Sequence, residues 1–227
     1  MRRKQVGGRP GTQTGPEAMV SGPSRAEVRA AIEGLPQDMS WTSLADSLMP
    51  VFIRRRPMPP GTGRPVTTRR PPGLEVAVAV DIGPAFLYVS EPWLDEWSVT
   101  FDTAIDRAMA NLHARVTAEA CVEMQYETIA GIPFWWHQSE HGLASGLLLL
   151  QDELVRRYGD EPRLLIAPMR NLLIAAPFDA DRELVAWVRD EVASEDPNGL
   201  DLPILALVEG RLSFDTRGMQ LRRASVH

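Results

Sequence analysis

The chain has 227 residues and a formal net charge of −6, with 44% hydrophobic and 24% charged side chains, which is ordinary for a globular protein. Its most membrane-like run, Leu143 to Leu150, is far shorter than the roughly 20 residues that span a bilayer, and no leader-like apolar segment opens the sequence. The single cysteine, Cys121, excludes an internal disulfide and a cysteine-based metal module. We therefore expect a cytoplasmic protein with no membrane partner.

Positive and negative charges are separated along the chain. Residues 1–73 carry 12 basic and 5 acidic side chains, a net charge of +7, whereas residues 74–227 carry 12 basic and 25 acidic side chains, a net charge of −13. Residues 1–23 are rich in Gly, Pro, Thr and Arg and show no hydrophobic periodicity. This composition predicts a disordered basic tail.

The pattern of residues 24–53 predicts a short helical lead-in. Ser24 and Glu27 have the spacing of a capping box at the start of a helix that ends near Gly34. A second helix is predicted over residues 41–49 and a short strand over residues 51–53. Residues 54–73 are rich in Arg and Pro and contain no acidic residue, so they cannot bury enough apolar surface to offset their ordering entropy. For them we predict a flexible loop.

Residues 74–217 show three rounds of two strands and a helix, followed by a last hairpin. Apolar and polar residues alternate over 74–82 and predict a strand, with a partner strand over 86–90 and a long helix over 100–116. The other expected strands lie near 122–127, 134–136, 163–167, 172–176, 204–208 and 211–214, and the other helices over 142–157 and 180–193. This order predicts an α+β fold, an antiparallel or mixed sheet built from repeated ββα units with helices packed on it. Residues 218–227 are expected to be a frayed tail.

The sharpest chemical motif is H-x-x-E-H, formed by His137, Glu140 and His141. On one helix the two histidines would share a face and ligate zinc while the glutamate polarises the attacking water, as in a zinc-dependent hydrolase. The context favours a solvated strand-to-helix turn, because residues 134–136 read as a strand and Ser139 is a good helix N-cap. The hydrolase is therefore an alternative hypothesis, and we expect no cofactor.

Ser145 lies among small residues, in the run Gly142–Gly146. The spacing G-x-x-S-G differs from the G-x-S-x-G of a nucleophile elbow. We interpret the small residues as a close packing contact between a helix and the sheet, and we assign no catalytic residue.

Tryptophan supplies the candidate partner-binding residues: Trp93, Trp97, Trp135 and Trp136. Two adjacent residues of a strand point to opposite faces, so one of Trp135 and Trp136 must leave the core side. An outward tryptophan needs cover from a helix, a partner or a ligand. Cover by the protein's own helices is the simpler interpretation, and anchoring of a partner protein is the functional one.

Arginines of the predicted loop form a second alternative site. Arg54, Arg55, Arg56, Arg69 and Arg70 could contact the phosphates of a nucleic acid. The segment lacks interleaved aromatic residues, and the remaining domain at −13 would repel a polyanion. The basic loop could equally lie against the acidic domain.

Four short runs resemble one family of bacterial proteins. They are VAVDIG (Val78–Gly83), AMANL (Ala108–Leu112), GLASGLLL (Gly142–Leu149) and IAPMRNLLI (Ile166–Ile174). Together they resemble the family of domain of unknown function 1444, the YtpQ-like proteins, over roughly residues 45–215. The resemblance implies a compact bacterial cytosolic domain, and it transfers no catalytic residue.

The sequence therefore favours a non-enzymatic interaction module, adaptor or chaperone-like, that binds another protein through an acidic, tryptophan-containing face. This hypothesis depends on the absence of a convincing catalytic constellation and on an analogy at the level of fold, which does not fix function. The zinc hydrolase and nucleic-acid association are the competing classes.

Overall fold

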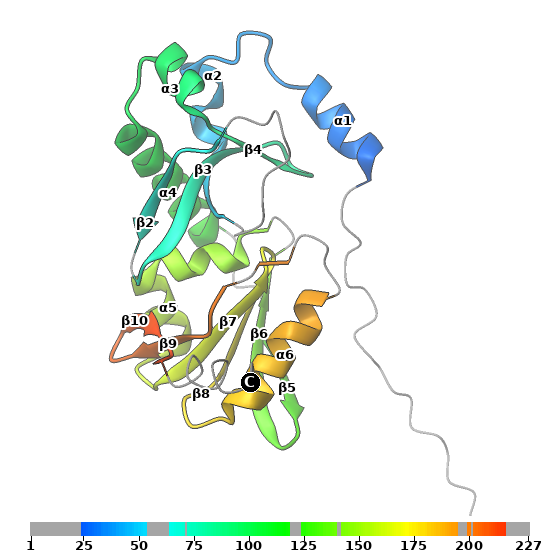
Figure 1. Ribbon diagram of the computed structural model, residues 1–227, viewed down its shortest axis with the longest axis vertical. Helices are drawn as coiled ribbons and strands as arrows, with labels where there is room; N and C mark the ends of the chain where they lie inside the picture. Colours follow the sequence, from blue (N-terminus) through cyan, green and yellow to red (C-terminus); the bar gives the residue numbers. More distant parts are fainter. Residues whose placement is uncertain are drawn as a thin grey trace, which may run out of the picture.

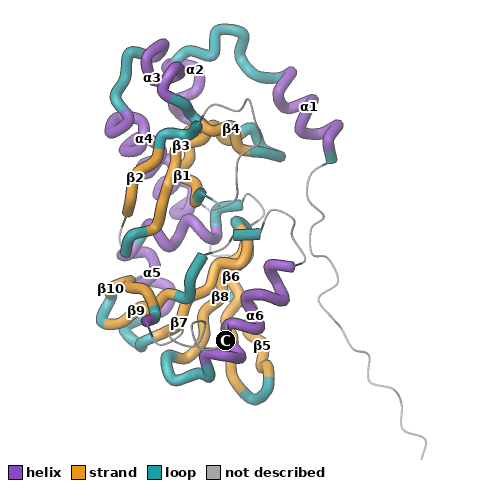
Figure 2. Tube along the Cα trace, viewed as in Figure 1, coloured by secondary structure: helices purple, strands orange, loops and turns teal. Residues whose placement is uncertain are grey.

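The strands are divided between two antiparallel sheets. The computed structural model describes residues 24–53, 64–70, 72–118, 124–139, 142–194, 199–200 and 202–216. Figures 1 and 2 show a smaller sheet and a six-stranded sheet at opposite ends of the molecule, with a helical segment between them. The predicted α+β class is confirmed, but a single sheet of repeated ββα units is not, because the hairpins belong to separate sheets. Within these ranges, no helix has the length and apolar character needed to span a bilayer.

The smaller sheet is built around one central strand, β3 (Leu74–Asp81). Strand β1 (Leu48–Phe52) lies along one edge of β3, while β2 (Thr67–Arg70) and β4 (Phe86–Tyr88) pair with successive parts of the other edge. The helices of this end are α2 (Trp41–Leu44), the short 3-10 helix η1 (Ala45–Ser47), α3 (Glu91–Trp97) and α4 (Phe101–Ala118).

Asn111 joins α4 to the start of β1. Its side-chain amide donates hydrogen bonds to the backbone carbonyl oxygens of Ala45 and Leu48, at 2.8 and 2.9 Å. These two carbonyls lie where the chain leaves η1 and enters the strand. The amide therefore gives both carbonyls a side-chain donor, and the Ala45 carbonyl also accepts from the Leu48 N–H within the 3-10 turn.

The amino-terminal boundaries differ from those predicted. Part of the predicted loop 54–73 is strand β2, in which Thr67 pairs with Ala77 and Arg70 with Leu74. The predicted helix 41–49 ends early because β1 begins at Leu48 and is fully buried against β3. The lead-in 24–53 therefore contributes a strand to the sheet, so the domain does not begin at residue 74. The predicted tails 1–23 and 218–227 lie outside the described residues.

The six-stranded sheet has the order β10-β9-β7-β8-β6-β5. Its strands are β5 (Gln125–Ile129), β6 (Ile132–Gln138), β7 (Arg163–Met169), β8 (Leu172–Pro177), β9 (Leu205–Val208) and β10 (Arg211–Phe214). Helix α6 (Arg182–Ser194) packs on one face, over Leu164 and Ile166. The opposite face, with Leu165 and Leu173, joins the apolar core shared with the smaller sheet.

A helical segment lies between the two sheets. It consists of the buried 3-10 helix η2 (Ala144–Leu149) and helix α5 (Gln151–Tyr158), of which Leu154 and Tyr158 are buried, and η2 contacts β1, β7 and β8. The sequence predicted one continuous helix over 142–157. The observed break at Leu150 follows from packing, because residues 144–148 are buried on all sides and the backbone adapts to both sheets.

Helix α1 (Arg25–Glu33) lies apart from both sheets (Figure 1) and has no buried residue. The predicted capping box is confirmed. The Glu27 amide donates to the Ser24 hydroxyl at 3.3 Å, and the Ser24 amide donates to the Glu27 carboxylate at 2.7 Å. Local sequence therefore determines where α1 starts, even though little tertiary packing supports the helix.

We expect substitution of Gly146 by alanine to weaken the contact between η2 and α4. A Cβ atom at Gly146 would lie 2.9 Å from a terminal methyl of the buried Leu112. Overpacking of this kind costs about 1–3 kcal/mol, which urea unfolding would measure. Gly34→Ala is the matched control, since Gly34 is exposed with a negative φ and should tolerate alanine. Equal stability of Gly146→Ala and the wild type would contradict the close approach.

Candidate functional site

The four candidate tryptophans do not share one surface. Trp93 and Trp97 lie on α3, at the end of the molecule that holds the smaller sheet, and Trp135 and Trp136 lie on β6 (Figure 1). The structure therefore divides the predicted partner-binding face into two separate regions.

The α3 tryptophans belong to an aromatic cluster. Trp97 is only 8% exposed, and its indole N–H donates to the backbone oxygen of Met39 at 2.7 Å. The rings of Trp41 and Trp93 have their centroids 5.8 and 5.5 Å from that of Trp97. These contacts join α2 and α3 to the core, so Trp97 has a structural role and is not accessible to a partner.

Trp135 and Trp136 point to opposite faces of the sheet, as the strand alternation predicts. Trp136 packs in the apolar cluster under α6, and Trp135 packs against the core on the other face. Both are half-buried. The guanidinium of Arg163 lies 4.1 Å from the Trp135 ring centroid, and the Tyr126 ring lies 6.0 Å away in an edge-on arrangement. Side chains of the protein itself therefore cover most of the Trp135 and Trp136 surfaces.

The exposed surface beside Trp135 is strand β5, at the rim of the six-stranded sheet. Residues 125–128 are all exposed, and Tyr126 is 62% exposed. Among the strands that the structure describes, β5 pairs only with β6. Its other side is therefore a free edge, where backbone donors and acceptors have no partner strand.

The register of the hairpin shows which backbone groups reach this edge. Ile129 and Ile132 flank a two-residue turn, and such a pair exchanges both ladder hydrogen bonds. The alternation then places Thr128 in a non-hydrogen-bonded pair with Pro133, which agrees with the missing N–H of proline. Tyr126, two residues earlier, is therefore also in a non-hydrogen-bonded pair, with Trp135. The N–H and C=O groups of Tyr126 and Thr128 therefore point away from β6, toward the free edge.

The first residue of the H-x-x-E-H motif, His137, does not lie on a helix. His137 is the sixth residue of strand β6 and is only 3% exposed. Glu140 and His141 lie outside the described residues. In the part of the chain that the structure describes, no group of three or more His, Cys, Asp or Glu side chains could hold a metal ion. The strand assignment removes the shared helical face on which the zinc interpretation depended.

The environment of His137 keeps its imidazole neutral. The pKa of His137 is lowered from 6.5 to about 4, chiefly by burial and also by the positive charge of Arg157, while Glu153 acts in the opposite direction. Glu153 itself is held ionised, since a hydrogen bond from Arg156, together with the charge of Arg157, lowers its pKa to about 2. The Nδ1 atom of His137 is buried and has no hydrogen-bond partner among the described residues.

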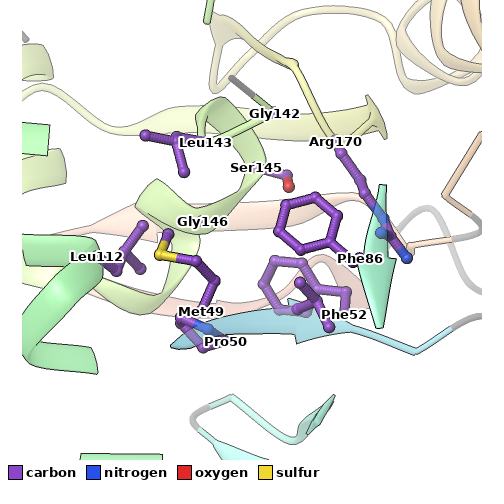
Figure 3. Close-up of a pocket in the computed structure, with 11 residues that line it drawn as sticks. Met49, Pro50, Phe52, Phe86, Leu112, Gly142, Leu143, Ser145, Gly146 and Arg170 are labelled. Carbon is purple, nitrogen blue, oxygen red and sulfur yellow. The ribbon is translucent and has the colours of Figure 1, made fainter. Parts of the chain in front are cut away.

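Among the described residues, no catalytic base lies beside Ser145. Its backbone N–H donates to the carbonyl oxygen of Arg170 at 3.0 Å, which fixes η2 on the β7–β8 turn. The hollow that it lines (Figure 3) contains no His, Asp or Glu side chain among its lining residues. A serine nucleophile would need such a base, so the position supports the packing interpretation.

The arginine site is only partly described. Arg69 and Arg70 lie on β2, and Arg54, Arg55 and Arg56 lie outside the described residues. The Arg70 guanidinium lies 3.8 Å from the Asp106 carboxylate of α4, whereas Arg69 is exposed. One of the predicted phosphate contacts therefore already has an acidic partner within the protein.

Two residues of functional interest were not predicted from the sequence. Tyr126 was assigned only to a strand, although it is 62% exposed there. Arg170 lies between the predicted strands 163–167 and 172–176, and its side chain crosses to the smaller sheet. No local signal in the sequence marks that contact.

Comparison with known proteins gives no match: no family model, no curated protein and no solved structure matches the chain.

We expect the stability of the protein to fall between pH 6.5 and pH 4 because of His137. In that range the unfolded chain binds a proton that the folded imidazole, with its lowered pKa, does not bind. The contribution is fully present above pH 6.5 and is lost as the pH falls, by about 3 kcal/mol in total. Urea unfolding of the wild type and His137→Gln from pH 7.5 to 4.5 measures the difference.

His113→Gln is the control, because His113 is exposed on α4. Its pH profile should follow that of the wild type, while that of His137→Gln should be flatter. Parallel profiles for the wild type and His137→Gln would show that the buried imidazole does not control acid stability.

Proposed function

We propose that the protein is a non-enzymatic protein-binding module, adaptor or chaperone-like, that takes an extended segment of a partner protein onto the free edge of β5. One observation carries the proposal: the outward backbone groups of Tyr126 and Thr128 lie on an exposed strand that has no second neighbour among the described strands. We also propose, from the sequence resemblance alone, that the chain is related to the family of domain of unknown function 1444. That relationship is compatible with a protein-binding role.

Strand addition suits the chemistry of this edge. An added strand would accept hydrogen bonds from the two outward N–H groups and donate to the two outward carbonyls, which supplies affinity without a preformed pocket. Proteins usually protect an edge with charged side chains, proline, a bulge or a very short strand. Strand β5, with the sequence QYETI, carries one charged side chain, Glu127, but no proline, and it keeps a regular register over five residues.

Aromatic side chains next to the edge supply an anchor. Tyr126 stands edge-on to Trp135, and Arg163 covers the Trp135 ring, so the three side chains form a row across the sheet. Tyrosine and tryptophan bury a large area at small conformational cost and dominate many interfaces. Trp135 is thus the one candidate tryptophan that we place beside the binding edge.

The alternatives have less geometry to support them. The zinc hydrolase has lost its helical geometry, because His137 lies on strand β6. Among the arginines proposed for nucleic-acid contact, Arg70 already faces the Asp106 carboxylate. We therefore place the interaction module first.

The direct test is a pair of substitutions at Thr128. Thr128→Pro removes an outward N–H without breaking the β5–β6 ladder, because Thr128 faces Pro133 in a non-hydrogen-bonded pair. Thr128→Val keeps the N–H and nearly the same shape. Peptides selected from a phage-displayed random library on the wild type provide the probe, and calorimetry measures their affinity for each variant.

The proposal predicts that Thr128→Pro weakens peptide binding about tenfold or more, whereas Thr128→Val leaves it within about twofold, since one lost hydrogen bond of about 1.4 kcal/mol is tenfold. Equal affinity for both variants would place the peptide elsewhere. A dimeric wild type that becomes monomeric on Thr128→Pro would identify a second copy of the chain as the occupant. Thermal melts of both variants verify that the fold is intact.

A further inference from the structure

The side chains of β5 alternate between the two faces of the sheet, and the two sets differ in chemistry. Tyr126 and Thr128 lie on the face that carries Trp135, and their hydroxyl oxygens lie 3.5 Å apart. Glu127 lies between them in sequence and on the opposite face, beside Phe134 of the cluster under α6. The side chains of an added strand alternate in the same way, so each face of β5 selects its own set of partner side chains.

The face of Tyr126 is aromatic, and the charge next to it is already paired. Tyr126 is 62% exposed, and Met124, two residues earlier, is 37% exposed. The Arg163 guanidinium over Trp135 also lies 2.8 Å from the Glu161 carboxylate. Aromatic residues form favourable cross-strand pairs with aromatic and β-branched residues. This face therefore favours valine, isoleucine or an aromatic residue in the partner.

Glu127 places a single negative charge at the middle of the edge. Its side chain is exposed, and none of the ion pairs found among the described residues includes it. Since its own N–H and C=O groups point to β6, an antiparallel added strand would face Glu127 in a non-hydrogen-bonded pair, in which side chains approach most closely. Opposite charges stabilise such a pair and like charges destabilise it, so the facing residue should be a cation.

The same carboxylate disfavours pairing between two copies of the chain. Two β5 edges related by a twofold axis would run antiparallel. Within the strand, one register satisfies the outward groups of both copies, with Tyr126 of each copy opposite Thr128 of the other. That register places Glu127 directly opposite the same residue of the second copy, where like charges repel. The edge therefore favours a different chain over a second copy.

We propose that the segment added to β5 is basic, with a lysine or arginine opposite Glu127 and β-branched or aromatic residues on either side of it, opposite Tyr126 and Thr128. This inference rests on the proposed strand addition and identifies the partner by its charge and pattern. The net charge of −6 of the whole chain favours the same partner, because it attracts a basic segment at long range. A second copy and an acidic segment are the occupants that the proposal excludes.

A charge swap across this pair is the test. The probes are two peptides with acetylated and amidated ends, Thr-Val-Lys-Val-Tyr and Thr-Val-Glu-Val-Tyr, which differ only in the central charge. Each is titrated into the wild type, Glu127→Lys and Glu96→Lys, and the shifts of the Tyr126 and Thr128 amide resonances give the affinity. Glu96→Lys is the matched control, since it changes the net charge equally from an exposed position on α3, at the other end of the molecule (Figure 1).

The wild type should bind the lysine peptide about fivefold more tightly than the glutamate peptide. Glu96→Lys should keep this preference, and Glu127→Lys should reverse it. Glu127→Gln keeps the shape of the side chain without its charge and should abolish the preference, which provides a second variant if Glu127→Lys does not fold. High salt should reduce the preference, because the pair is exposed.

Two results would overturn the basic partner and leave strand addition intact. One is equal affinity of the wild type for both peptides, with shifts at Tyr126 and Thr128. The other is an unchanged preference for lysine in Glu127→Lys, which would assign the selectivity to a charge elsewhere. A wild type that dimerises through β5 would also contradict the proposal.

The peptides selected from the random library cover the case in which neither short probe binds. If their binding is lost in Thr128→Pro, their sequences decide: a basic residue between β-branched or aromatic residues supports the proposal, and an acidic or uncharged centre overturns it. If no selected peptide is sensitive to Thr128→Pro, strand addition itself is wrong, and the basic partner is rejected with it.

Discussion

The close insertion of η2 between the two sheets is the constraint on which the rest of the structure depends. Gly146 approaches Leu112 of α4 so closely that a methyl group there would force the buried Leu112 side chain to shift. On the other side, the Ser145 amide bonds the Arg170 carbonyl, and the Ser139 amide bonds that of Asn171. The segment thereby fixes the β7–β8 turn beside the smaller sheet, and residues from both sheets share one apolar core. The molecule should therefore unfold as one unit.

The same arrangement determines which surfaces remain available to ligands. The centre of the six-stranded sheet is covered by α6 on one face and joins the common core on the other, so its inner strands have no accessible backbone. At the rim, β5 extends beyond this cover and keeps unpaired backbone groups. At the junction, the β7–β8 turn carries Arg170 against Phe86. The candidate binding edge is thus a product of incomplete cover.

The sequence predicts the local elements well and the long-range arrangement poorly. The capping box of α1, the strand at β3 and the opposed directions of Trp135 and Trp136 depend on nearest neighbours, and the structure contains all three. The burial of β3 does not alternate, however, because Ala77 and Ala79 are buried as well. Strand β2 was missed because its two threonines are embedded in an Arg- and Pro-rich segment, and only pairing with β3 reveals them. The division into two sheets and the position of Arg170 arise from contacts between residues distant in sequence, such as Arg170 with Tyr88, which no periodicity encodes.

Residue-resolved amide hydrogen exchange tests the central claim, that a partner segment is added to β5, most directly. The Glu127 amide already lies in a hydrogen-bonded pair with Phe134, while those of Tyr126 and Thr128 point outward. With a saturating selected peptide, exchange should slow markedly at Tyr126 and Thr128 and change little at Glu127. Protection confined to the opposite edge, at β10, or the absence of new protection along β5, would contradict the account.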